Sequence, residues 1–350
     1  MRPNGLLWHC PLKAVKLYRK DSSRMKHTHL ILLAAAAAGL IRLGAQQPSH
    51  AFTKADYDRM VTELSNWNRW GKDDQRGTVN LITPATRKRA AGVVREGFPV
   101  SLSHDVLKEA AADNRQPFEH QMLSTGVSPT SQVGLDRFAV SYHVYAHTHL
   151  DALGHLFLNG KMYNGIPQQR VTAKGAEMLD ILAFKDGIFA RGILVDIPRL
   201  KGVPYLEPGT PIYPEDLEAW EKKAGIRMGS GDVVFIRTGR WARRAALGPW
   251  ESTRFAGLHA LCAKWLRQRD IAMIGSDSAL DVMPSGIEGV NAPLHPLMIV
   301  VMGTPIFDNC DLEALGEAAD QRRRWEFLLT AAPLTVPGGT GSPLNPIAIF

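Results

Sequence analysis

The sequence predicts an α/β fold in which a mixed sheet and its helices form a single domain. Short apolar or β-branched runs bounded by turn residues recur along the chain, and helical stretches follow them repeatedly in its second half. The 350 residues, of which 45% are hydrophobic and 21% charged, are enough for one large domain with a proper core. No internal repeat or long low-complexity segment indicates a second fold.

The first 45 residues have the pattern of an export signal. They hold eight Lys or Arg residues against the single acid Asp21, which accounts for the whole formal net charge of +7. Basic residues precede an apolar run from Leu30 to Ile41, and small residues close the segment at Ala45. We therefore predict an N-terminal leader at residues 1–45, with the signal peptide itself at 25–45, Met25 as the more natural start and cleavage near Ala45.

Without this leader, residues 46–350 are formally neutral. The basic charge therefore does not predict binding to nucleic acid or to an anionic membrane surface. The apolar run of the leader is shorter than the roughly 20 residues that span a bilayer as a helix. We expect an exported protein, periplasmic or secreted, with no membrane contact beyond export; an uncleaved anchor is the alternative.

The predicted elements of residues 46–350 begin with a helix. Apolar residues at helical spacing place it within 51–67, and turn residues at 68–77 predict a loop that carries Trp70. Alternating apolar residues predict strands at 99–104 and 138–151. Further strands are predicted at 192–197, 232–237 and 271–274, and further helices at 214–224 and 258–269.

Two cysteines, Cys262 and Cys310, lie beyond the leader. They could form one disulfide in an oxidising compartment, but their spacing matches no disulfide framework and no CxxC motif. We expect two buried thiols, because free cysteine is among the residues most often buried.

A row of polar residues occupies one face of the predicted strand at 138–151. Because side chains in a strand alternate with period two, His143, Tyr145, His147, His149 and Asp151 share that face. Buried polar groups without partners are costly, so such a face requires a metal, a substrate or water. Imidazole and carboxylate groups are ligands that Zn, Mn and Fe(II) accept without thiolate. The row therefore predicts a divalent-metal site, although part of it could instead bond to backbone groups.

Further candidates lie downstream of this row. His155 follows a predicted turn at 152–154 and could return as another ligand or as a base. His295 and Asp308 bracket an apolar run that we expect to be a buried helix or strand, and spacing alone leaves them as either site or scaffold residues. Asp277 and Asp281 follow a predicted strand and could line a pocket or cap turns.

The segment Ala146–Phe157 resembles the signature His-x-Gly-Thr-His-x-Asp-x-Pro-x-His of the cyclase family, which includes bacterial kynurenine formamidases and isatin hydrolases. Several other blocks resemble the family in the same order, so that the resemblance covers most of residues 60–350. These blocks are 68–83, 161–165, 236–239, 274–277, 305–315 and 333–343.

The resemblance implies a swivelling β/β/α fold and a metal-dependent hydrolase at 46–350. It implies attack by water on Zn or Mn at the C–N bond of a small amide, either a cyclic amide or an N-formyl aromatic amine. It also implies a homodimer or a larger homo-oligomer. Lactone hydrolysis at the same site, and a non-catalytic exported protein that binds a metal or ligand on this scaffold, are the alternatives. A serine hydrolase is not indicated, because no Gly-x-Ser-x-Gly motif is present.

Residue by residue, the resemblance implies that His149 and Asp151 are metal ligands. His155 matches the final signature histidine, which is a second-metal ligand or a catalytic base. His295 falls where the family has its downstream histidine, and Asp308 stands where kynurenine formamidases have glutamate. The last two residues would hold a second metal or orient the ligands of the first.

The chain departs from the signature at its first histidine. That position holds Tyr145, and His147 stands in place of the signature glycine. Either residue could fill the first ligand position; we prefer His147, because neutral imidazole binds these metals more readily than a phenol of pKa about 10. The hypothesis is that His147, His149 and Asp151 hold one cation and that His155 takes the proton of its bound water.

Aromatic residues predict where a substrate would bind. Trp70, with Trp67 beside it, could form a lid over an aromatic substrate, or both rings could pack the first helix against the domain. Tyr145, if it is not a ligand, is a second candidate for substrate binding.

Overall fold

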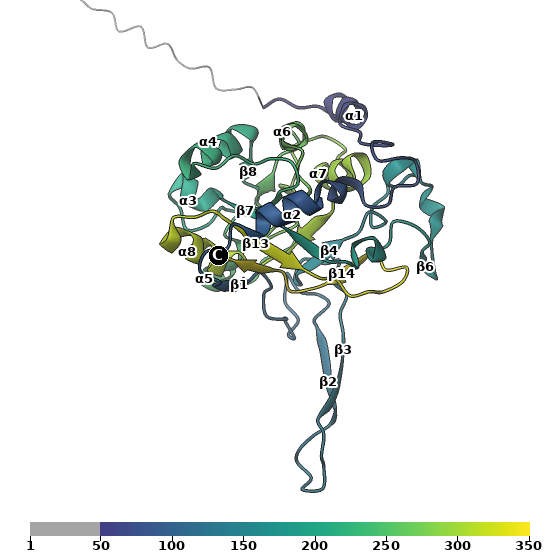
Figure 1. The fold of residues 1–350 in the computed structure, drawn as a ribbon, viewed down its shortest axis with the longest axis vertical. Helices are drawn as coiled ribbons and strands as arrows, with labels where there is room; N and C mark the ends of the chain where they lie inside the picture. The colour runs from purple at the N-terminus through teal and green to yellow at the C-terminus, as the bar shows by residue number, and fades with distance from the viewer. Residues whose placement is uncertain (1–49) are drawn as a thin grey trace, which may run out of the picture. The chain divides into compact units, whose positions relative to one another are not determined.

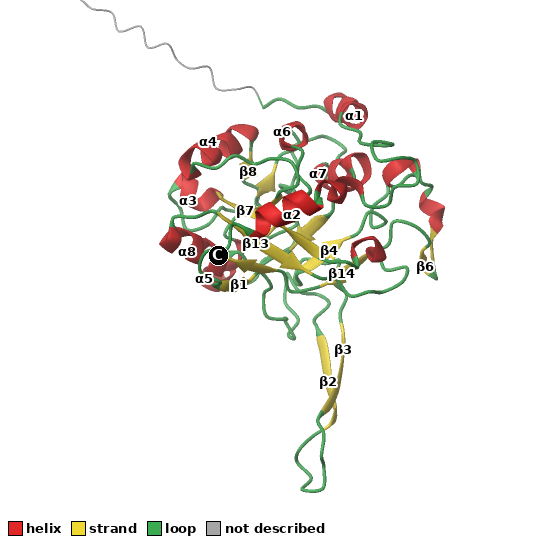
Figure 2. Ribbon diagram, in the orientation of Figure 1, coloured by secondary structure: helices red, strands yellow, loops and turns green. Residues whose placement is uncertain are grey.

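A computed structural model describes residues 50–350, so the predicted leader lies outside the described residues. The described chain is built around a nine-stranded sheet, with helices on its faces (Figures 1 and 2). In spatial order its strands are β1 (Pro99–Ser101), β15 (Ile347–Ile349), β13 (Glu326–Ala331), β7 (Ile188–Asp196), β9 (Val233–Arg237), β11 (Met273–Ser276), β12 (Ile306–Asp308), β4 (His149–Asp151) and β14 (Gly341–Pro343).

The four central strands β7, β9, β11 and β12 pair in parallel, and the strands outside them pair antiparallel. Strand β9 is typical of this parallel centre. Its residues Val233–Ile236 are all buried, as expected of a strand that is covered on both faces. This architecture confirms the predicted α/β fold with a mixed sheet.

Helices connect the parallel strands and pack against them. Helices α2, α4 and α8 contact β7, and α3 contacts β9. The helices are α1 (Lys54–Glu63), α2 (Pro84–Ala91), α3 (Ile197–Lys201), α4 (Pro214–Ala224), α5 (Arg240–Leu247), α6 (Cys262–Arg269), α7 (Leu294–Pro296) and α8 (Glu313–Arg322), with a π-helical turn η5 (Leu297–Met302) after α7.

Helix α4 illustrates how the sequence fixes an element. Pro214 begins it, where a missing N–H costs nothing, and Gly225 ends it with φ +66°, a conformation that glycine adopts without strain. Trp220 is buried and donates from Nε1 to the carbonyl of Leu194 in β7 at 2.8 Å. The helix predicted at 214–224 is therefore confirmed.

Shorter elements join this framework. Gly257–Leu258 pairs with Pro211–Ile212, so the helix predicted at 258–269 begins only at Cys262. The short strands are β2 (Glu119–Ser124), β3 (Leu135–Ala139), β5 (Val171–Thr172), β6 (Gly175–Ala176), β8 (Pro211–Ile212) and β10 (Gly257–Leu258), and the 3-10 turns are η1 (Gly77–Leu81), η2 (Tyr163–Gly165), η3 (Gln168–Arg170) and η4 (Ile181–Phe184).

The continuous strand predicted at 138–151 was wrong. Strand β3 ends at Ala139 and pairs with β2 in a hairpin that extends away from the sheet (Figure 1), whereas β4 covers only His149–Asp151 and joins the main sheet. The chain bends over residues 143–147 as it passes from one sheet to the other. The strand predicted at 99–104 is also shorter, because β1 ends at Ser101.

Two further expectations can be compared with the described residues. Cys262 and Cys310 are buried free thiols. The apolar run between His295 and Asp308 is the buried η5 followed by β12, as expected. Within residues 50–350, no helix combines the length and the apolar character needed to cross a bilayer.

Candidate metal centre

The register between β4 and β12 brings together two residues that are distant in the sequence. His149 lies directly opposite Asp308 in the antiparallel pair, so their side chains share one face of the sheet. Asp151 follows His149 by two residues and uses the same face. One ligand atom from each of the three lies within 4.8 Å of the others, and all three residues are buried. They form the first group that could hold a metal ion.

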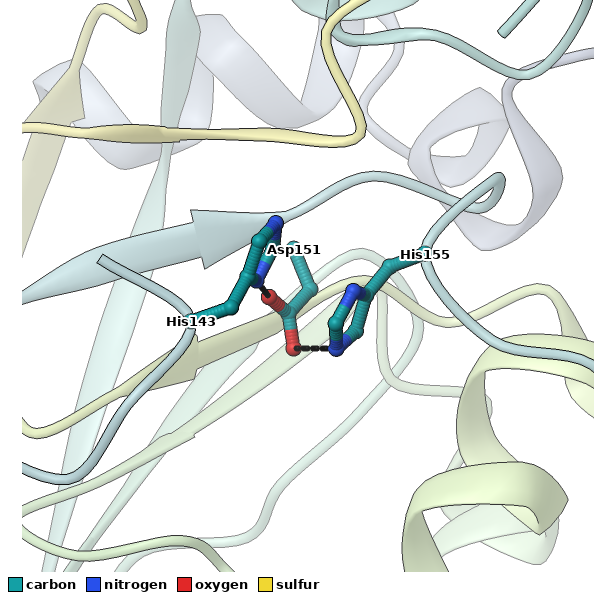
Figure 3. Close-up of side chains that lie close together, drawn as sticks. All are labelled: His143, Asp151 and His155. Atoms are coloured by element: carbon teal, nitrogen blue, oxygen red, sulfur yellow. Dashed lines mark ion pairs between the residues drawn. The ribbon is translucent and has the colours of Figure 1, made fainter. Parts of the chain in front are cut away.

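A second group shares Asp151 with the first. It contains His143 and His155, whose rings stack with centroids 3.9 Å apart. Nδ1 of His143 lies 2.9 Å from Oδ1 of Asp151, and Nε2 of His155 lies 3.9 Å from Oδ2. Figure 3 shows each carboxylate oxygen directed toward one of the two rings. Asp151 is therefore common to both groups.

Buried atoms without partners show that the residues fit a cation. Both oxygens of Asp151, Oδ1 of Asp308 and Nδ1 of His143 have no hydrogen-bond partner. Nδ1 of His143 is near Asp151 but is not aligned for a hydrogen bond. Leaving buried carboxylates without donors is costly, and a cation would remove that cost. A donor set of imidazole nitrogens and carboxylate oxygens, without thiolate, suits Zn or Mn.

In His149 and His143, the ring nitrogen that faces away from Asp151 already has a hydrogen-bond partner. Nδ1 of His149 bonds the carbonyl of His147 at 2.8 Å, which leaves Nε2 to face Asp151 at 3.4 Å. Nε2 of His143 lies 3.1 Å from the hydroxyl of Thr340, which leaves Nδ1 to face the same carboxylate. A histidine oriented by a bond at one nitrogen and open at the other has the arrangement of a metal ligand.

His295 belongs to neither group and is instead held between two carboxylates. Its Nδ1 lies 2.6 Å from Oδ2 of Asp281, and its Nε2 lies 3.0 Å from Oδ2 of Asp308. Burial opposes the charged imidazolium, but the charges and hydrogen bonds of the two aspartates outweigh burial and hold the pKa of His295 well above its ordinary value. His295 therefore orients Asp308, and Asp281 orients His295.

Burial and mutual charge also shift the ionisation of the remaining residues. Burial opposes the charged form of Asp151, but the neighbouring imidazoles of His155, His143 and His149 hold its pKa well below the ordinary value. Burial lowers the pKa of His155 to about 4, despite the neighbouring Asp151 charge. His155 is therefore neutral near pH 7, the form in which imidazole binds metal or accepts a proton.

The structure does not bring His147 to either group. Its Nε2 lies 3.4 Å from the carbonyl of Gln116, and its ring meets Phe118 edge-on with centroids 6.2 Å apart. Burial lowers its pKa. Because the chain bends over 143–147, the alternation of the predicted strand does not extend upstream of His149. His143, which shares the predicted row but was not among the preferred ligands, lies beside Asp151 instead.

The bend is stabilised by two buried residues, Arg240 at the start of helix α5 and Asn309 just after strand β12. The guanidinium of Arg240 donates to the carbonyl of Tyr145, and Nδ2 of Asn309 donates to the carbonyl of Val144 at 2.7 Å. Nη1 of Arg240 also donates to Oδ1 of Asn309 at 2.5 Å. These side chains satisfy backbone groups that a continuous strand would have paired in a ladder.

Glycine leaves room for His143 in the neighbouring strand. A Cβ atom at Gly341 would lie 2.7 Å from Cε1 of His143 and 2.6 Å from the carbonyl oxygen of Leu150. Both distances are shorter than a normal van der Waals contact, so only a residue without a side chain fits beside this imidazole.

A cavity of about 310 Å³ opens over the centre and is lined by His143, His149, His155, His295 and Asp308 at its polar end. Tyr145 lines it too, and its ring packs against Phe255 with centroids 4.9 Å apart. The structure does not bring Trp70 to this cavity. The guanidinium of Arg69 lies 4.5 Å from the centre of the Trp70 ring, and Trp67 donates from Nε1 to the carbonyl of Val300 at 2.8 Å.

Comparison with known proteins identifies the class to which this fold and site belong. The model of the family Cyclase, described as "Putative cyclase", matches residues 100–280. The crystal structure of a novel cyclase is 31% identical, covering 82% of this chain and 100% of its own, with a TM-score of 0.74. The chain belongs to the cyclase family, as the signature at Ala146–Phe157 predicted.

Isatin hydrolases share the fold at lower identity. Isatin hydrolase A from Ralstonia solanacearum is 20% identical over 74% of this chain and 93% of its own, with a TM-score of 0.51. Isatin hydrolase A from Labrenzia aggregata, bound to benzyl benzoate, is 20% identical over 74% and 94%, with a TM-score of 0.53. No curated protein sequence matches this chain.

Proposed function

We propose that the protein is a metal-dependent hydrolase that cleaves the C–N bond of a small amide, either a cyclic amide or an N-formyl aromatic amine. The observation that carries this proposal is the buried carboxylate of Asp151. Both of its oxygens lack hydrogen-bond partners while His143, His149 and His155 surround it at a cavity wall. Membership of the cyclase family and the fold shared with isatin hydrolases support the same reaction class.

The residues divide the work of such a site. His149, Asp151 and Asp308 would hold a divalent cation, Zn or Mn, and His143 and His155 could complete its coordination or hold a second cation beside Asp151. When bound, such a cation lowers the pKa of a coordinated water and polarises a carbonyl group.

Proton transfer falls to His155 in this proposal. Its ring lines the cavity with Nε2 3.9 Å from Asp151, and where it is not itself a ligand it would accept a proton and deliver it to the leaving nitrogen. His295, held by Asp281, keeps Asp308 in place. A lactone would use the same residues with an alkoxide as leaving group, so a substrate panel must include both bond types.

Metal analysis followed by a substrate panel tests the proposal. The full chain, loaded with Zn or Mn, is assayed on N-formyl aromatic amines, cyclic imides and lactones, and His149→Ala is compared with the wild type. We expect His149→Ala to lose both stoichiometric metal and amide hydrolysis. His120→Ala is the matched control, because His120 lies in the hairpin and pairs with Asp136. A His149→Ala protein that retained metal and activity would contradict the proposal, and a metal-loaded wild type inactive on the whole panel would support the non-catalytic alternative.

We further propose that residues 1–45 direct export and that the mature protein is a homodimer or larger homo-oligomer acting on a small molecule. The charge and apolar pattern of the leader supports export. N-terminal sequencing of the mature protein should find a start near position 46, and light scattering should give a mass of at least twice that of one chain.

A further inference from the structure

We propose that the cavity over the metal centre selects substrates that carry no negative charge, an inference that rests on the proposed function and defines its substrate class. Such substrates are compact, ring-bearing amides without a carboxylate group. Derivatives of amino acids would then be excluded.

The lining of the cavity separates into two parts. The histidines and Asp308 in the lining all belong to the metal centre or to its supporting hydrogen bonds. The remaining wall is formed by apolar residues and one tyrosine: Val144, Tyr145, Leu156, Ala279, Met283, Ala292 and Pro296. Among residues 50–350, no lysine or arginine lines the cavity. A carboxylate bound against this wall would lose its hydration without gaining a counter-charge, which is strongly unfavourable.

The imidazolium of His295 lines the cavity but is already paired with the carboxylates of Asp281 and Asp308. The nearest arginine and lysine are paired as well. Arg240 reaches the carbonyl of Tyr145, but its guanidinium is buried, bonded to Asn309 and 4.0 Å from the carboxylate of Asp113. Lys54 lines an adjoining hollow, which shares Ala292 and Pro296 with the cavity. Its Nζ is paired with the carboxylate of Asp58 at 2.6 Å. Neither residue offers a free positive charge to a substrate.

The size of the cavity narrows the class further. A volume of about 310 Å³ lies at the lower end of the roughly 300–1,000 Å³ typical of small-molecule pockets. Tyr145 presents an aromatic ring at this wall, and Met283 is a flexible thioether that adapts to ring edges. The space and the chemistry therefore suit a substrate of one or two rings.

Two probes of similar shape test the inference: N-(4-methylphenyl)formamide, which is uncharged, and 4-formamidobenzoate, which carries a carboxylate. Calorimetry measures their binding to the full chain after chelation, so that neither probe can bind through a metal. We expect the uncharged probe to bind more tightly by about tenfold or more. Met283→Lys should reduce this preference by about fivefold or more by supplying a counter-charge, whereas Met283→Gln, which is similar in length and neutral, should not.

Equal affinity of the wild type for the two probes, a preference for the carboxylate, or no saturable binding of either probe at millimolar concentration would overturn the inference. The inference would also be overturned if Met283→Lys and Met283→Gln had the same ratio of affinities for the two probes. Hydrolysis of both probes is then measured on the zinc-loaded protein. Selective binding of the uncharged probe without hydrolysis would support the inference and contradict the proposed function. Hydrolysis of both probes without selective binding would support the proposed function and contradict the inference.

Discussion

The carboxylate of Asp281 fixes the orientation of His295 by contacting both the imidazole and the backbone N–H of His295. The carboxylate lies 2.6 Å from Nδ1 of His295 and accepts backbone N–H groups from Leu294 at 2.6 Å and His295 at 3.1 Å. Nε2 of the imidazole is thereby directed to Asp308 at 3.0 Å. Asp281, which is not a candidate ligand, thus controls through His295 the position of Asp308, which is one.

Replacing Asp281 with asparagine tests this chain of contacts. The amide has one acceptor oxygen in place of two and no charge, so we expect His295 to lose its fixed orientation and Asp308 its partner. Metal affinity should fall by roughly 10–100-fold, the typical cost of losing such an orienting group. Competition with a chelator measures it. In a His295→Ala background, Asp281→Asn should lower metal affinity little further. If the two losses of affinity were fully additive, Asp281 would act independently of His295.

A comparison of two histidines tests which one belongs to the metal centre. His143 faces Asp151 at 2.9 Å, whereas His147 contacts the carbonyl of Gln116. We expect His143→Ala to lower metal affinity by at least tenfold, because it removes one donor of a small ligand set. His147→Ala should leave metal stoichiometry intact. Metal analysis of both purified variants decides, and metal loss in His147→Ala with full retention in His143→Ala would reverse this assignment.

The fold was predictable where local pattern and burial agree. The helix at 214–224 has a proline at its start and a glycine after its end, and the strand at Val233–Arg237 is a short apolar run between turns. The signature around His149 and Asp151 gave the family from residues alone. In these segments, the residues that determine the structure lie in the segment itself or directly next to it.

The candidate site was less predictable because it depends on contacts distant in the sequence. The pairing of His149 with Asp308 comes from the register of β4 on β12, which spacing cannot supply. The bend that turns His147 away and brings in His143 is held by Arg240 and Asn309. A period-two pattern assumes an unbroken strand, and nothing local in the sequence marks the break.

Arg240 should matter for both stability and substrate binding. Burial lowers the pKa of its guanidinium to about 10, and the side chain donates to the carbonyl of Tyr145 and to Asn309. Arg240→Met would leave both acceptors unsatisfied, so we expect a loss of about 2 kcal/mol or more in the free energy of unfolding, measured by urea denaturation. Because Tyr145 lines the cavity, KM should rise more than kcat falls.

Arg244→Met is the matched control for Arg240→Met. Arg244 lies on the same helix α5 and pairs with Asp113 at 2.7 Å, without contact to Tyr145. It should lower stability while leaving KM close to the wild-type value. If both variants raised KM equally, the effect of Arg240 would be a general loss of stability.

The ion pair between Arg69 and Asp270 should give stability a defined dependence on pH. It joins the loop after α1 to the end of α6, with contacts of 2.5 and 2.7 Å. The hydrogen bond and charge of Arg69 lower the pKa of Asp270 despite its partial burial. A carboxyl group whose pKa is lower in the folded state stabilises the protein above its unfolded pKa of about 3.9, and this contribution is lost as the pH falls through the folded value.

Asp270→Asn isolates this contribution, because Asp270 has φ +55° and asparagine tolerates that conformation as well. At pH 7 the variant should be less stable by roughly 0.5–1 kcal/mol, since the pair is partly exposed to solvent. The difference should stay constant down to about pH 4 and shrink below it, where the wild type also becomes protonated. Urea denaturation across this range measures it, with Arg69→Gln expected to show the same trend. A difference that stayed constant to the lowest pH would mean that Asp270 acts through its turn geometry and not through its charge.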